Sequence, residues 1–92
     1  MKILSLDTST NIFSIAVSDG DNVIAEFFGD AGPAASARIP GHIQSLLKDA
    51  CLDISAIDAF AVTVGPGAFT GLRVGIALVK GLAYSTGKPI IP

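Results

Sequence analysis

The chain has 92 residues, which is enough for one small domain. Half of the residues are hydrophobic and 15% are charged, against roughly 25% charged in a typical globular protein. The net charge is −2 and the six Lys and Arg residues are scattered, which argues against direct nucleic-acid binding because phosphate neutralisation needs clustered cations. The low charge favours an apolar surface that meets another chain or a missing part of this one.

Cysteine usage and the lengths of the apolar runs indicate a compartment. The single cysteine excludes an internal disulfide and is typical of a reducing cytosol. The longest apolar stretch, residues 74–79, is bounded by Arg73 and Lys80 and is far too short to span a bilayer. We therefore expect a cytoplasmic protein that does not enter a membrane.

The first thirty residues predict three antiparallel strands. Residues 2–7 form a short, mostly apolar run that ends on a carboxylate. Residues 11–19 alternate large and small side chains with period two, and residues 23–29 continue an apolar run. The intervening "DGDN" is a tight-turn signal, so we expect a meander.

A first helix is predicted after a loop of small residues. One apolar stripe at helical spacing ends near Cys51 and is made of Ile39, Ile43, Leu46, Leu47 and Ala50. The start of this helix is left open, because Ser36 is a possible N-cap while "PG" at 40–41 is both a turn signal and a tolerable first turn.

The second half predicts a strand, a helix and a further strand. The run "AFAVTVG" at 59–65 reads as a strand, and a helix is expected from about Thr70, its candidate N-cap, to Ser85, with Gly87 as the stop. The final "KPIIP" begins another strand. We interpret 1–92 as a fragment, the alternative being a short edge strand that closes a compact domain.

The order βββαβαβ predicts an α/β fold with a mixed sheet and helices packed on it. A three-strand antiparallel start followed by strand–helix units matches the ribonuclease-H-like lobe of actin, sugar kinases and Hsp70. This is an analogy of fold and specifies no activity.

Two stretches are candidates for phosphate binding. Asp7, Thr8 and Ser9 follow the first strand, where a carboxylate and hydroxyls can face phosphates and a hydrated magnesium ion. Gly65 and Gly67 lie between a strand and a helix, where free N–H groups and the helix dipole attract anions. The alternatives stay open: the first group has ordinary turn residues, and the glycines permit positive φ and close packing.

The second helix is more apolar than one buried stripe requires. Only Arg73 and Lys80 are charged between residues 71 and 85, and Ala77, Gly81 and Ser85 form a stripe of small residues at spacing four. This pattern favours contact with a partner helix over a purely internal role. The predicted interface comprises Ile39, Ile43 and Leu46 of the first helix and Arg73, Val74, Ala77, Leu78, Gly81 and Ser85 of the second.

Other chemistry-bearing residues carry little signal. A single histidine, His42, offers no zinc site of usual spacing and no triad, and we expect it to be a solvated helix residue. Cys51 has no basic neighbour and is interpreted as a small hydrophobic residue. Turn residues, solvated faces and caps are the roles expected for Asp19, Asp21, Asp30, Asp49, Asp53 and Asp58. We predict no metal site and no catalytic residue.

The strings "KILSLDTST" and "VGPGAFTGLRVGIALVKGLA" resemble the bacterial TsaB (YeaZ) family. The resemblance covers essentially the whole chain, is strongest at 3–10 and 65–83, and is to the first lobe of a two-lobed family. It implies an actin-like lobe from an inactive paralogue of the TsaD enzyme of threonylcarbamoyl-adenosine tRNA modification. It further implies pairing with TsaD, or with itself, through helices of this lobe, and assembly with the ATPase TsaE. No cofactor is expected, and ATP or ADP only in the complete assembly.

The chain also departs from the pattern of that family. The active paralogue holds a metal through two histidines on its first-lobe helix, whereas the stretch here has Ile39, Gly41, His42 and Ile43. Many members begin this helix with a His-Ser-Glu string, where this chain has residues 35–37, "ASA", which bears on the contacts of that helix. Three functions are therefore ranked: a non-catalytic partner in tRNA modification, a nucleotide-binding lobe and, last, a glycoprotease-type peptidase.

Overall fold

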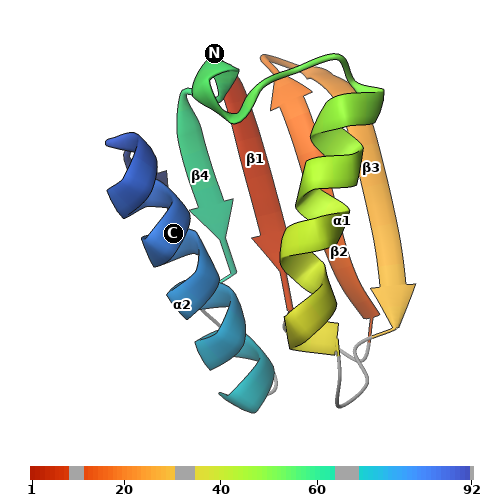
Figure 1. Ribbon diagram of the computed structural model, residues 1–92, viewed down its shortest axis with the longest axis vertical. Coiled ribbons are helices and arrows are strands. Elements are labelled where there is room, and N and C mark those ends of the chain that lie inside the picture. Colours follow the sequence, from red (N-terminus) through yellow and green to blue (C-terminus); the bar gives the residue numbers. More distant parts are fainter. Residues whose placement is uncertain (9–11, 31–34, 64–68, 92) are drawn as a thin grey trace.

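A computed structural model describes residues 1–8, 12–30, 35–63 and 69–91, with the side chains at 35, 36, 69–72 and 74 excepted (Figure 1). Five strands, two helices and a short 3-10 turn follow one another in the order β1 (Lys2–Asp7), β2 (Ile12–Asp19), β3 (Asn22–Asp30), α1 (Ala35–Asp49), η1 (Ile54–Ala56), β4 (Ala59–Val62), α2 (Phe69–Thr86) and β5 (Ile90–Ile91). The predicted order of strands and helices is confirmed.

The strands form one mixed sheet in the order β3-β2-β1-β4-β5. β1, β2 and β3 pair antiparallel, while β4 pairs parallel with both β1 and β5. The predicted tight turn is confirmed, since Asp19 pairs with Asn22 and Gly20 between them has φ +60°. The crossovers from β3 to β4 and from β4 to β5 run through α1 and α2 respectively (Figure 1).

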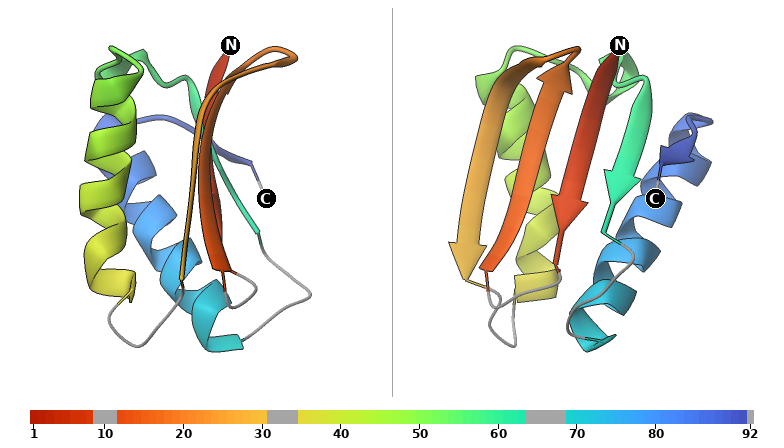
Figure 2. Two further views of the ribbon diagram at one scale, coloured as in Figure 1. Left: turned by 90° about the vertical axis from the view of Figure 1, so that its right-hand side faces the viewer. Right: turned by 180° about the vertical axis from the view of Figure 1, so that it is seen from behind.

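Both helices cover the same face of the sheet (Figure 2). α1 packs over β3, and α2 packs over β4 and β1. Strand alternation supplies the core, because every second side chain of β1 and β2 faces the helices. The buried residues of this layer are Leu4, Leu6, Phe13, Ile15, Val17, Ile39, Ile43, Leu46, Leu47, Ile57, Phe60, Val62, Val79 and Ala83.

The starts of the two helices are the features of the fold that the sequence predicts least sharply. α1 starts at Ala35, so Ser36 lies in its first turn rather than at the N-cap, and Pro40 lies inside the helix rather than in a turn. α2 starts at Phe69, one residue before the expected start at about Thr70, so Thr70 lies in its first turn rather than at the N-cap. The first residue of a helix is uncertain by one or two positions, because several neighbouring residues can serve as its N-cap.

The helix ends differ in chemistry. Cys51 adopts the left-handed conformation at φ 57°, with its N–H donated to the Lys48 carbonyl at 3.0 Å and the N–H of Leu52 donated to the Leu47 carbonyl at 2.9 Å. These two bonds are those of a Schellman motif, which usually has glycine at this position. α2 ends at Gly87 as predicted, with φ 71° and its N–H donated to the Ala83 carbonyl at 2.8 Å.

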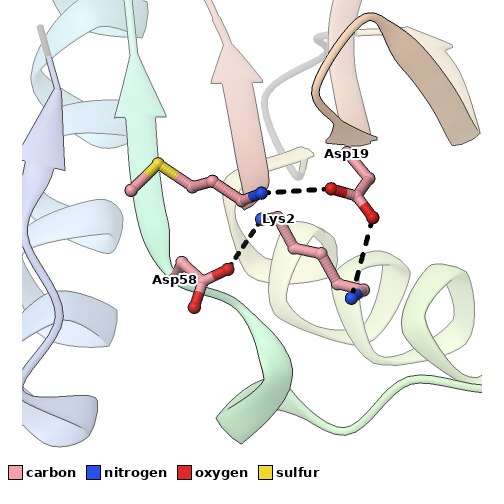
Figure 3. A network of polar contacts seen from close by, with 4 residues as sticks. Lys2, Asp19 and Asp58 are labelled. Carbon is pink, nitrogen blue, oxygen red and sulfur yellow. Dashed lines mark hydrogen bonds and ion pairs between the residues drawn. The ribbon is translucent and has the colours of Figure 1, made fainter.

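A polar network joins the amino end of β1 to its neighbours (Figure 3). The Met1 amino group lies 3.1 Å from Asp19 Oδ1, and Lys2 Nζ lies 3.8 Å from Asp19 Oδ2. The backbone N–H of Lys2 donates to Asp58 Oδ2 at 2.7 Å, which lowers the pKa of the Asp58 carboxyl because the bond favours the charged form. Asp53 caps η1 by accepting from the Ser55 N–H at 3.1 Å. The expected cap role is confirmed for Asp53 and the turn role for Asp19, whereas Asp58 holds the distant strand β1.

Candidate partner-binding site

Helix α2 buries one side and leaves a row of small residues on the other. Val79 and Ala83 are buried against the sheet, as is Gly75. The predicted stripe of Ala77, Gly81 and Ser85 is exposed along its whole length. Spacing by four residues keeps the three on one face of the helix, and that face points away from the sheet.

Large side chains flank this stripe on α2. Tyr84 is 92% exposed, and Arg73 and Lys80 are also exposed, whereas Leu78 and Leu82 on the side towards α1 are half-buried. A tyrosine buries a large apolar ring when it packs, so an almost fully exposed ring is an available contact. The stripe is thus bordered by an aromatic and cationic edge on one side and by leucines on the other.

Two glycines of α2 have opposite surroundings. A Cβ at Gly75 would lie 2.5 Å from the Thr8 hydroxyl oxygen, so the absence of a side chain allows α2 to approach the end of β1. A Cβ at Gly81 would have no atom of the described residues within 4 Å, apart from its chain neighbours and its own helix backbone. Each glycine costs about 1 kcal/mol in a helix interior relative to alanine. Packing within the chain explains Gly75 but not Gly81.

An open groove of about 320 Å³ runs between α1 and α2. Its lining is mainly apolar and consists of Pro40, Ile43, Gln44, Leu47, Ile54, Leu78, Leu82, Ser85 and Thr86. Ser85 belongs both to this groove and to the small-residue stripe of α2. The groove and the stripe are therefore continuous on the outer side of the helix pair.

Gly41 of α1 also belongs to this surface, although it is not among the predicted interface residues. Gly41 lies inside α1 and is exposed, and among the described residues a Cβ there would meet no atom within 4 Å outside its own helical turn. The sequence leaves open whether Pro40 and Gly41 form a turn or the first turn of this helix, and the predicted interface does not include Gly41. We name the exposed surface formed by Gly41, Gln44, Ala77, Gly81 and Ser85 the helix-pair face.

The contribution predicted for α1 is corrected by the structure. Ile39 is 2% exposed, and Ile43 and Leu46 are also buried, because α1 turns its apolar stripe onto the sheet. Side chains in the core are not available to another chain. Leu78 and Arg73 do reach the surface, and the side chain of Val74 lies outside the described part.

The predicted phosphate-binding residues are placed only in part. Thr8 is 5% exposed and Asp7 is half-buried at the end of β1. β1 and β4 are parallel neighbours, with Leu6 opposite Val62 and the Thr63 N–H donated to the Leu6 carbonyl at 3.2 Å, so both strands leave the sheet at one edge. Ser9, Gly65 and Gly67 lie outside the described residues. The phosphate site stays a prediction.

His42 and Cys51 differ from their expected roles. His42 is half-buried and its ring stacks on Phe27, with centroids 4.5 Å apart, while Phe13 lies 5.7 Å away. The expectation of a solvated histidine is wrong, because this ring packs α1 against β3. Cys51 is exposed rather than packed as a hydrophobic residue. Within residues 1–8, 12–30, 35–63 and 69–91, no three His, Cys, Asp or Glu side chains are grouped to hold a metal ion.

Neither described helix combines the length and apolar character that crossing a bilayer requires.

Comparisons with known proteins identify the family. The family model described as TsaD, tRNA N6-adenosine threonylcarbamoyltransferase, matches residues 23–92. The chain is 38% identical over 90 residues to the tRNA threonylcarbamoyladenosine biosynthesis protein TsaB of Bacillus subtilis, and 36% identical over 92 residues to that of Escherichia coli. These alignments cover 98% and 99% of this chain but 39% of each relative. The chain thus spans about two fifths of the length of these relatives.

Solved structures agree with this assignment. YeaZ from Pseudomonas aeruginosa superposes with a TM-score of 0.89 at 34% identity, covering 98% of this chain and 42% of that one. The RuvC structure from Thermus thermophilus, at 14% identity and a TM-score of 0.63, shares the fold alone. The mixed sheet with its two helices is a ribonuclease-H-like, actin-like lobe, as predicted. The chain belongs to the TsaB (YeaZ) family.

Proposed function

We propose that the chain is a non-catalytic partner in the formation of threonylcarbamoyladenosine in tRNA, and that it docks onto a TsaD-type enzyme through the helix-pair face. The names of the TsaB relatives supply the process. The observation that carries the docking surface is Gly81, an interior helix glycine whose Cβ position has no tertiary neighbour within 4 Å in the described part of the chain.

The physical support is the free-energy cost of the two helix glycines Gly41 and Gly81, which no contact within the described chain offsets. A glycine inside a helix is unfavourable by about 1 kcal/mol relative to alanine, and such residues persist where something offsets that cost. Thr8 explains Gly75, but no atom of the described chain explains Gly81 or Gly41. A helix of a partner could pack close to the backbone at both glycines, because helix axes approach most closely where side chains are smallest.

The groove between α1 and α2 adds a recess to the helix-pair face in which a partner's side chain could insert. Leu78 and Leu82 are half-buried at its wall, so a partner's apolar side chain inserted there would remove their remaining surface from water.

Light scattering with a purified TsaD-type enzyme tests the proposal. The expected result is a complex with the mass of one copy of each protein, formed at micromolar concentration. The chain alone should show a mass that rises with concentration, because we propose that the same face pairs two copies when the enzyme is absent. The ATPase TsaE is proposed to join only the assembled pair. A strict monomer that leaves the enzyme unaltered at 100-fold excess would contradict the proposal.

A nucleotide-binding lobe is a second candidate, supported by the edge at which β1 and β4 end together. Asp7 and Thr8 lie at this edge, where ligands of open α/β sheets commonly bind. If this lobe binds nucleotide by itself, calorimetry with ATP and magnesium should show micromolar binding by the chain alone. The absence of heat would favour the first candidate, for which we propose that ATP or ADP binds only in the complete assembly.

A further inference from the structure

We draw no further inference here: the strongest candidate, the sheet face turned away from α1 and α2, where Ser5, Ala16 and Ala61 share one register row, carries none because nothing in the structure shows what covers it.

Discussion

Helices α1 and α2 cover the same face of one sheet but differ in what they present to solvent (Figure 2). α1 buries its apolar stripe and exposes polar residues such as Arg38, Ser45 and Lys48. α2 buries Val79 and Ala83 yet still exposes Ala77, Gly81, Tyr84 and Ser85. α1 turns its apolar stripe onto the sheet and adds only Gly41 and Gln44 to the helix-pair face, whereas α2 exposes a whole stripe of small residues and Tyr84 that the sheet does not cover.

The largest expected effect on the free energy of unfolding comes from comparing a buried residue of α1 with a half-exposed residue of α2. Ile39→Ala removes a side chain that is 2% exposed, and it should lower the free energy of unfolding by about 3 kcal/mol through lost burial and a cavity. Leu78→Ala removes a half-exposed side chain and should cost about 1 kcal/mol. Urea unfolding followed by circular dichroism measures both. Equal losses at the two positions would break the distinction between α1 and α2.

Next in size is the close approach of α2 to β1. Gly75→Val adds a side chain whose Cβ would lie 2.5 Å from the Thr8 hydroxyl oxygen, and it should destabilise the chain by about 2 kcal/mol through overpacking. Thr8→Ala in the same chain should recover part of the loss, since the two sites are in contact and a double-mutant cycle reports their coupling. An additive result would show that Thr8 is not the residue that requires glycine there.

Substitutions at the ends of the two helices should have smaller effects on the free energy of unfolding, and these effects should have opposite signs. Cys51→Gly should raise the free energy of unfolding by about 1 kcal/mol, because glycine adopts the positive φ of this position without steric cost. Gly87→Ala at the end of α2 should lower it by a similar amount. Midpoints of urea unfolding under reducing conditions compare the two variants. A destabilised Cys51→Gly chain would exclude this account of the α1 terminus.

The smallest effect is the pH dependence of the network at the amino end of β1. The hydrogen bond from the Lys2 N–H lowers the folded pKa of Asp58 below its unfolded value near 3.8. A depressed folded pKa stabilises the folded chain above the unfolded pKa, and this contribution is lost as pH falls through the folded pKa. Unfolding measured between pH 2 and pH 6 should show a shallower acid loss in Asp58→Asn. Superimposable curves for the two chains would show that Asp58 contributes nothing.

Local patterns in the sequence predicted the elements of this fold well. Period-two alternation in residues 11–19 predicted β2, and the glycine at 87 predicted the end of α2, because both signals act over a few residues. The sequence also predicted that Ala77, Gly81 and Ser85 share a face.

Contacts between distant residues explain what could not be predicted. Gly75 and Gly81 are both glycines inside α2. They differ because Thr8, which is distant in the sequence, lies against Gly75 and not against Gly81. The role of His42 depends on Phe27 of a different strand. The apolar stripe of α1 was visible in the sequence, but its burial by the sheet rather than by a partner is a property of the assembled layers.

The central claim is that α2 presents Gly81 to a partner, and one comparison of dissociation constants tests it directly. Gly81→Glu should weaken binding of a TsaD-type enzyme at least ~100-fold, because a charge would be buried without a partner. The chain alone should keep or gain stability, since no described residue of another element lies within 4 Å of the Gly81 Cβ position. Val23→Glu places the same charge at an exposed position on β3 and should leave binding unchanged. If Gly81→Glu binds as tightly as Val23→Glu, the helix-pair face is not the docking surface.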